Sequence, residues 1–274
     1  MTANQRPYAE VIGDPIKHSL SPVIHRFWLH ALGIEADYRR HRVARADFPA
    51  FLAARRTDSD WRGCNVTMPL KLDAVALADD STDRAVAAGA ANLLIPRDGK
   101  LLAGNTDVGG VRALFERLIA NGVPVRSVTL LGNGGAARAI LVALHDLGLD
   151  QVRIQSRDHG AAVKLAVEFG LREAPRSFTE PVESDLLVNA TPMGMAGQAD
   201  VAIDLSAMPS TGLILDLVTD PANTALLRAA RARGLATLDG LDMLVEQAAD
   251  SFPLLFGSEP PRDRDADLFA KLRA

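Results

Sequence analysis

Short apolar segments alternate with amphipathic segments along the first part of the chain. Runs rich in apolar and β-branched side chains predict strands, and apolar residues that recur every three or four positions predict helices. An alternation of the two is typical of an α/β domain with a largely parallel sheet. By these criteria the strands are residues 9–13, 38–43, 63–67 and 92–96, and the helices are residues 22–32, 48–55 and 70–78.

A second alternating series follows a predicted helix at residues 108–120 and indicates a Rossmann-type, doubly wound domain. Its strands are residues 127–131, 152–155, 186–189 and 213–217, and its helices are residues 136–147 and 222–233. A last helical segment, residues 241–256, has no strand after it to extend this sheet, so we expect it to return to the first domain. The expected organisation is an α/β substrate domain of residues 1–106, completed by 241–274, and a nucleotide-binding domain of residues 107–240.

The charge and composition narrow the class of partner. The formal net charge is −4 with both signs interspersed, so neither a nucleic-acid-binding face nor a polybasic membrane patch is expected. No apolar run is long enough to span a bilayer, and the expected partner is a small molecule. The single cysteine, Cys64, and the polar N-terminus favour a cytoplasmic protein. The histidines lack the spacing of a metal site, so no metal is expected, and a monomer and a homodimer both remain open.

A glycine-rich turn lies between the predicted strand 127–131 and the helix after it. The turn reads Gly132-Asn133-Gly134-Gly135-Ala136-Ala137, which matches the pattern G-x-G-x-x-A in the context that this pattern requires. Glycines permit a tight turn and a close approach of the backbone to a pyrophosphate, and the helix N-terminus offers unpaired N–H groups. The turn therefore predicts a dinucleotide site.

The end of the second strand of that domain bears on which dinucleotide binds. An acidic residue there accepts the ribose 2′-hydroxyl of NAD, but this chain has Ser156 and Arg157, followed by Asp158. A guanidinium suits a 2′-phosphate because it can hold two of its oxygens. NADP is favoured over NAD on this basis, although Asp158 points the other way and Arg157 could be an ordinary solvated charge.

Two serines precede the first predicted helix. Ser21, followed by Pro22, has the pattern of a helix N-cap, and this interpretation needs no ligand. Ser19 has no such explanation, and two hydroxyls beside a helix N-terminus form a plausible carboxylate site.

Lys71 is predicted in the first turn of a helix, where the helix dipole disfavours a cation. That position suggests an anionic partner or a lowered proton affinity, against the alternative of an exposed surface lysine. Asn65 and Thr67 alternate along the preceding strand, so their side chains are expected on one side. Asp107 starts the helix 108–120 and could simply cap it. Placed in a cleft between two domains, Asp107 and Lys71 would form an acid–base pair.

Together these segments resemble the shikimate dehydrogenase family, from Val11 to nearly the end of the chain. Each motif is short, but seven of them occur in the family's order and spacing. They are residues 13–22, 65–71, 89–92, 105–107, 132–137, 189–192 and 239–249.

The resemblance implies reversible hydride transfer between NADPH and the ring ketone of 3-dehydroshikimate, in the biosynthesis of chorismate and aromatic amino acids. It implies that Ser19 and Ser21 hold the substrate carboxylate and that Lys71 exchanges the proton at the reacting oxygen. The remaining residues that it implies for the substrate are Asn65, Thr67, Asn92, Asp107 and Gln247. For the nicotinamide side of the cofactor it implies Asn189, Ala190, Thr191, Leu217, Gly240 and Met243.

The chain also departs from the family pattern. Thr219 occupies the place of a usual tyrosine, and Ala161 that of an expected second arginine. These changes keep open a related enzyme that acts on quinate or a similar cyclohexane carboxylate, with NAD. A non-catalytic nucleotide-binding protein is a further alternative, but the presence of both Lys71 and Asp107 disfavours it.

Overall fold

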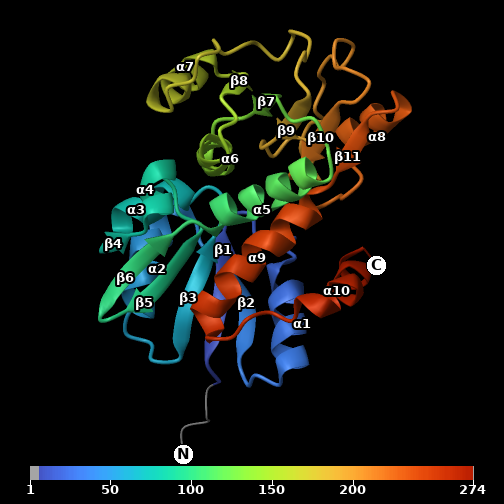
Figure 1. Ribbon diagram of the computed structural model, residues 1–274. Helices are drawn as coiled ribbons and strands as arrows, with labels where there is room; N and C mark the ends of the chain where they lie inside the picture. Colours follow the sequence, from blue (N-terminus) through green and yellow to red (C-terminus); the bar gives the residue numbers. More distant parts are fainter. Residues whose placement is uncertain (1–5, 274) are drawn as a thin grey trace, which may run out of the picture. The chain divides into compact units, whose positions relative to one another are not determined.

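The computed structural model describes residues 6–273, and its backbone contacts divide the chain into two units. The first unit comprises Met1–Gly110 and Val245–Ala274, and the second comprises Val111–Leu244. The chain passes from one unit to the other within two helices, α5 (Thr106–Ala120) and α9 (Gly240–Phe256) (Figure 1). The expected boundaries, after residues 106 and 240, lie at the starts of these helices.

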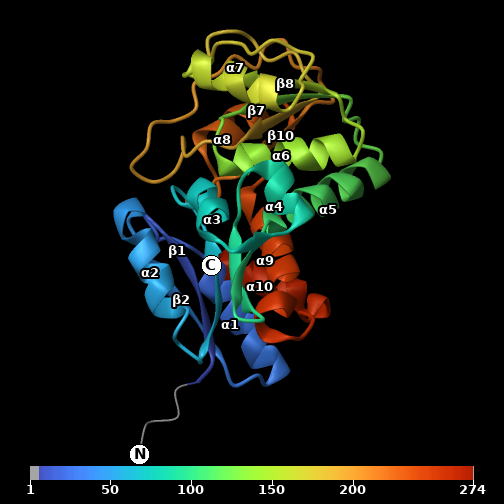
Figure 2. The ribbon, with the colours of Figure 1, turned by 90° about the vertical axis from the view of Figure 1, so that its left-hand side faces the viewer.

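A six-stranded mixed sheet forms the centre of the first unit. Its strands are β1 (Tyr8–Gly13), β2 (Asp37–Arg42), β3 (Trp61–Val66), β4 (Asp80–Ser81), β5 (Leu93–Arg97) and β6 (Lys100–Gly104). The other elements of this unit are α1 (Ser21–Leu32), η1 (Arg45–Asp47), α2 (Phe48–Arg55), α3 (Lys71–Leu77), α4 (Asp83–Ala88), η2 (Arg262–Arg264) and α10 (Asp265–Leu272). The strand order is β2-β1-β3-β5-β6-β4, with β5 antiparallel to both of its neighbours. Figure 2 shows α2 on one face of this sheet and α1 and α10 on the other.

The strand β1 lies inside the sheet and belongs to the core of the first unit. All six residues of β1 are buried, because it is paired with β2 and β3 and covered by helices on both faces. One core cluster includes Trp61, Phe48 and Leu70, each at most 2% exposed. Because β3 and β5 are antiparallel, Thr67, which follows β3, and Asn92, which precedes β5, lie at the same edge of the sheet.

The second unit is built on five parallel strands, as the Rossmann-type prediction requires. Its elements are β7 (Ser127–Leu131), α6 (Gly135–Asp146), β8 (Gln151–Gln155), α7 (His159–Glu168), β9 (Leu186–Asn189), β10 (Leu213–Asp216), α8 (Ala225–Ala232) and β11 (Ala236–Leu238). The order is β11-β10-β9-β7-β8, and a single parallel bridge from Gln155 to Arg176 lies beyond β8. With that bridge counted as a shortened third strand, the order is the Rossmann order 3-2-1-4-5-6. The Rossmann-type domain is therefore confirmed.

Several short elements were not predicted from the sequence, namely β4, β6, β11, α4, α7 and α10. The return of the C-terminal segment is confirmed, because Val245–Ala274 belongs to the first unit. Among residues 6–273, no helix combines the length and the apolar character that a membrane span needs.

Candidate active site

Lys71 and Asp107 form an ion pair in the first unit. Lys71 is the first residue of α3 and Asp107 lies in the first turn of α5. The Lys71 Nζ donates to Asp107 Oδ2 at 2.6 Å, and the two side chains are 16% and 6% exposed. The lysine at this helix start therefore has an anionic partner, and it is not an ordinary surface lysine.

Asn92, which directly precedes β5, links this ion pair to Gln247 of α9. Its Nδ2 donates to Asp107 Oδ1 and to Thr106 Oγ1, both at 2.9 Å, and more weakly to Gln247 Oε1 at 3.4 Å. Its Oδ1 accepts from the backbone N–H of Thr106 at 2.7 Å. The amide thus holds the first turn of α5, and Gln247 of α9 joins the same network.

The cap of α5 differs from the sequence interpretation. Asn105 Oδ1 accepts from the Val108 N–H at 3.3 Å, so Asn105 performs the capping that Asp107 was considered for. Asp107 does not cap the helix, and both of its carboxylate oxygens instead meet side-chain donors, Lys71 and Asn92.

Asn65, on β3, is buried and lies between Tyr38 and Asn92. Its Oδ1 accepts from the Tyr38 hydroxyl at 2.7 Å, and its Nδ2 donates to the Asn92 carbonyl at 3.3 Å. Thr67 follows β3, and its methyl group would lie 2.5 Å from a Cβ at position 13, so the close approach requires Gly13. Sequence analysis did not identify Tyr38, because an aromatic residue in a strand is most simply a core residue.

Ser19 and Ser21 contact each other at the start of α1. Their Oγ atoms are 3.3 Å apart, and the Ser21 N–H donates to Ser19 Oγ at 3.4 Å. The N-cap interpretation of Ser21 is wrong: Leu20 stands at the N-cap, without a side-chain cap hydrogen bond, and Ser21 is the first residue of the helix. The exposed Arg40 of β2 donates from Nε to the Ser19 carbonyl at 2.7 Å. Arg40 was also missed, because its relation to Ser19 depends on the fold.

The glycine turn of the second unit has the expected backbone. Gly132 has φ +106, and its N–H donates to the Gln155 carbonyl at 3.2 Å. A Cβ on Gly132 would lie 3.0 Å from Thr191 Cγ2 and 3.1 Å from the Ala190 carbonyl, so the turn packs against residues 190–191. Asn133 follows in the turn, Gly134 stands at the N-cap of α6, and the helix begins with Gly135 and Ala136. No side chain within the described part of the chain caps α6, so its first N–H groups suit an anionic phosphate.

The end of β8 shows what Asp158 does. Asp158 is the N-cap of α7, and its Oδ1 accepts from the Ala161 N–H at 2.9 Å. The buried Ser156 accepts from the Asp158 N–H through its Oγ at 3.2 Å. Arg157 is exposed and forms no hydrogen bond or ion pair with the residues that the structure describes. The acidic residue therefore has a local structural role, and the guanidinium beside it is available to a ligand.

The strand ends β9 and β10 carry the remaining residues expected at the cofactor. Asn189 Nδ2 donates to Asp216 Oδ1 at 2.8 Å, and Asn189 Oδ1 accepts from the Thr191 hydroxyl at 2.7 Å. Burial raises the pKa of the Asp216 carboxyl. A Cβ on Gly240 would lie 2.5 Å from the Leu217 carbonyl, so only glycine allows this approach. Met243 is buried in the same unit.

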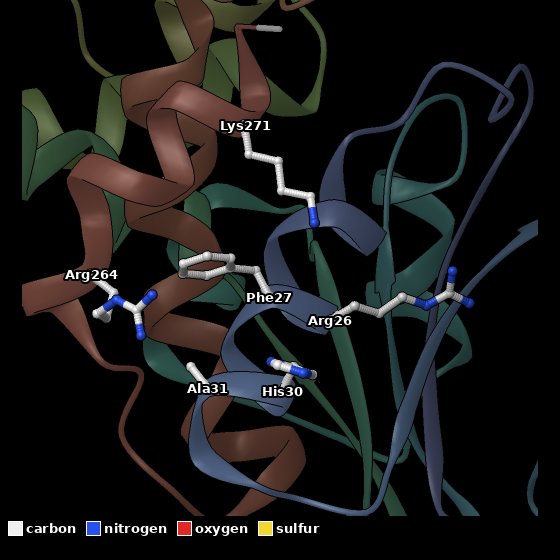
Figure 3. A pocket seen from close by; sticks show the side chains of 6 residues that line it. All are labelled: Arg26, Phe27, His30, Ala31, Arg264 and Lys271. Carbon is white, nitrogen blue, oxygen red and sulfur yellow. The ribbon is translucent and has the colours of Figure 1, made fainter.

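A surface pocket of about 550 Å³ lies elsewhere in the first unit, beside α1 and α10 (Figure 3). Its lining contains none of the residues expected to bind substrate or cofactor, and it consists of Arg26, Phe27, His30, Ala31, Arg264 and Lys271. Within residues 6–273 there is also no cluster of three or more His, Cys, Asp or Glu side chains that could hold a metal ion.

Known proteins resemble this one over nearly the whole length of the chain. Residues 11–94 match the family model of the shikimate dehydrogenase substrate binding domain, and residues 240–266 match that of the shikimate 5'-dehydrogenase C-terminal domain. A shikimate dehydrogenase (NADP(+)) from Sphingopyxis alaskensis is 47% identical over 98% of this chain and 97% of that protein.

Two solved structures correspond to the two alternatives considered from the sequence, an enzyme of shikimate with NADP and one of quinate with NAD. Shikimate 5-dehydrogenase from Thermus thermophilus, in complex with NADP(H) and shikimate, is 36% identical with a TM-score of 0.85, over 97% of this chain and 99% of that one. Quinate dehydrogenase from Corynebacterium glutamicum, in complex with NAD, is 31% identical with a TM-score of 0.83, over 98% and 100%. On its sequence identity to these proteins, together with the two domain matches, the chain belongs to the shikimate dehydrogenase family.

Proposed function

We propose that this protein catalyses the reversible reduction of 3-dehydroshikimate to shikimate with NADPH. The observation that carries the proposal is the ion pair between Lys71 and Asp107, held by Asn92, in a chain of this family. The names of its relatives support the choice of substrate and cofactor, since the Sphingopyxis protein is an NADP(+) enzyme and the Thermus structure contains NADP(H) and shikimate.

Lys71 is the proposed acid and base of the reaction. NADPH, when bound, supplies the hydride to the ring carbonyl. Negative charge then develops on the carbonyl oxygen, and the Lys71 ammonium stabilises it and donates a proton to it. In the reverse direction the lysine accepts the proton of the hydroxyl group. Asp107 acts through the 2.6 Å hydrogen bond, because it fixes the direction of the Lys71 side chain and balances its charge.

The other polar residues of the first unit are proposed to recognise the substrate. Ser19 and Ser21 bind the carboxylate, since their hydroxyls lie 3.3 Å apart at the N-terminus of α1. The ring hydroxyls bind to the carboxamide and hydroxyl groups of Asn65, Thr67 and Gln247, and Asn92 contributes chiefly by holding Asp107.

The cofactor residues of the second unit divide by the part of NADP that they contact. The turn Gly132-Asn133-Gly134-Gly135-Ala136 holds the pyrophosphate against the start of α6. Ser156 and Arg157 bind the 2′-phosphate. The nicotinamide side is bound by Asn189, Ala190, Thr191, Leu217, Gly240 and Met243. NADP is preferred over NAD because Asp158 caps α7, whereas Arg157 forms no ion pair with the residues that the structure describes.

The test is a comparison of four substrate and cofactor pairs. The absorbance of reduced nicotinamide is followed with shikimate or quinate, each with NADP or NAD. We expect the highest kcat/KM for shikimate with NADP. A higher kcat/KM for quinate with NAD would instead assign the protein to the quinate branch, for which Thr219 in the usual tyrosine position is the relevant departure.

The acid–base role of Lys71 has its own test. Lys71→Ala should lower kcat by about 100-fold or more, because general acid–base catalysis contributes about that much, and should change the KM for shikimate far less. Lys100→Ala, which removes an exposed lysine at the start of β6, is the matched control and should leave both constants unchanged. A variant in which only KM rises would make Lys71 a binding residue.

A further inference from the structure

We propose that Tyr38 is a positioning residue of the substrate site and that it acts through Asn65. This inference rests on the proposed function, in which Asn65 binds a ring hydroxyl. The Tyr38 hydroxyl donates to Asn65 Oδ1 at 2.7 Å, and both side chains are buried. Tyr38 touches none of the reacting groups. Its hydroxyl sets the orientation in which the Asn65 amide meets the substrate.

The strand register explains how a residue two strands away reaches Asn65. Tyr38 of β2 is paired with Ala9 of β1, and Asn65 of β3 is paired with Val11 of β1. Paired residues share a face of the sheet, and so do residues two positions apart in one strand. Both side chains therefore lie on one face, and the Tyr38 side chain reaches across β1 to Asn65.

The hydrogen bonds of Asn65 show which of its donors and acceptors remain for a ligand. A carboxamide has two N–H donors and an oxygen with two lone pairs. In Asn65 one lone pair accepts from Tyr38, and one N–H donates to the Asn92 carbonyl at 3.3 Å. One donor and one acceptor are left, in fixed directions. A flipped amide would place its oxygen against the Asn92 carbonyl oxygen, so the two bonds together select a single orientation.

Packing fixes the position of the Tyr38 hydroxyl. The ring is 0% exposed and is stacked on His25, with centroids 4.0 Å apart and an interplanar angle of 3°. Burial also raises the pKa of Tyr38 well above its usual value, so the hydroxyl keeps its proton and remains a donor. Since Asn65 contacts the Asn92 backbone, this anchored hydroxyl supports the same network that holds Asp107 and Lys71.

The chain offers a matched pair of variants, because it contains only two tyrosines, Tyr8 and Tyr38. Tyr8 lies on the adjacent strand, and its hydroxyl donates to Asp58 at 2.6 Å, apart from the site residues. Tyr38→Phe should raise the KM for shikimate about five- to tenfold, which is the effect of losing one net hydrogen bond, with kcat and the KM for NADP within about twofold. Tyr8→Phe should change none of the three constants.

A double-mutant cycle separates positioning from a general loss of stability. Asn65→Leu removes the amide through which Tyr38 acts, so adding Tyr38→Phe to it should not raise the KM for shikimate further. The double variant removes both partners of the Tyr38–Asn65 bond, and the Asn92 carbonyl keeps its bond from the Val66 N–H at 2.7 Å, so it leaves neither group of the Tyr38–Asn65 pair buried without its partner and folds even where Tyr38→Phe alone does not. An unchanged KM in Tyr38→Phe, or an equal rise with and without Asn65, would overturn the inference. A wild-type protein that does not turn over shikimate would instead refute the proposed function.

Discussion

We expect one buried histidine, His25 of α1, to lower the stability of the folded protein as the pH falls below 6.5. Its ring lies among aromatic side chains, 4.0 Å from Tyr38 and 5.8 Å from Phe252 between centroids. The side chain is 0% exposed, and neither ring nitrogen has a hydrogen-bond partner among residues 6–273. Desolvation disfavours the charged imidazolium, and it lowers the pKa of His25 from 6.5 to about 3.

The sign and size of the effect follow from proton linkage. Below pH 6.5 the unfolded chain binds a proton at His25, whereas the folded chain remains neutral until about pH 3. The unfolded state therefore binds more protons in this window, and the free energy of unfolding falls as the pH falls. At about 1.4 kcal/mol per pH unit, the loss is about 3 kcal/mol between pH 7 and 4.5 and about 4 kcal/mol by pH 3, where the folded chain also begins to bind the proton. Above pH 6.5 His25 has no effect on the pH dependence.

Urea unfolding followed by tryptophan fluorescence measures this loss of stability in the first unit, to which His25 belongs. The chain has two tryptophans, Trp28 and Trp61, both buried in the first unit. In His25→Phe, which keeps an aromatic ring at the site, the free energy of unfolding should fall by about 3 kcal/mol less than in wild type between pH 7 and 4.5. His30→Phe, on the exposed side of the same helix, should keep the wild-type pH dependence.

Carboxylates also titrate in this range, so only the difference between wild type and His25→Phe isolates the histidine. If the two proteins lose equal stability between pH 7 and 4.5, His25 is not held neutral by burial, and the reasoning from its aromatic surroundings is wrong.

Two further predictions concern arginines. Arg157→Ala should raise the KM for NADP by about tenfold or more, which is the effect of losing charge-assisted bonds to a phosphate, and should leave the KM for NAD nearly unchanged. Arg172→Ala, which removes an exposed arginine of the same unit, is the control. Equal changes of both KM values in Arg157→Ala would exclude a contact with the 2′-phosphate. Arg40→Gln should raise the KM for shikimate about two- to fivefold without changing kcat, because an exposed charge beside Ser19 attracts the carboxylate weakly. The control is Arg39→Gln, which removes a positive charge from the neighbouring residue, whose side chain pairs with Asp37. A similar rise of the KM in this variant would contradict a local role of Arg40.

The second unit was the more predictable from sequence, for a physical reason. The strands at residues 127–131 and 186–189 were predicted with the bounds that the structure shows, because buried parallel strands are continuous apolar runs. The glycine turn was recognisable because Gly132 adopts a positive φ that favours glycine. In the first unit, β6 was missed although Asp98 and Gly99 form a tight turn with positive φ at both residues, a strong hairpin signal.

The candidate site was predictable in its residues but not in its contacts. Lys71 and Asp107 were identified from local signals, whereas their partnership depends on two helices that meet only in the folded unit. The cap of α5 could not be assigned from sequence, because Asn105, Thr106 and Asp107 can all cap a helix. The distant Asn92 decides between them, since it holds the Thr106 N–H and so fixes where α5 begins.

The two asparagines of the site have different tasks, and their hydrogen bonds show it. Asn92 Nδ2 has two hydrogens and three nearby acceptors, on Thr106, Asp107 and Gln247, and its Oδ1 accepts from the Thr106 N–H and hydroxyl. In this arrangement Asn92 has no polar hydrogen left for a ring hydroxyl. Asn65 keeps one donor and one acceptor. The resemblance to the family implies substrate contact for both asparagines. The geometry indicates that Asn92 chiefly holds Asp107 toward Lys71, whereas Asn65 keeps the donor and the acceptor that a ligand can use.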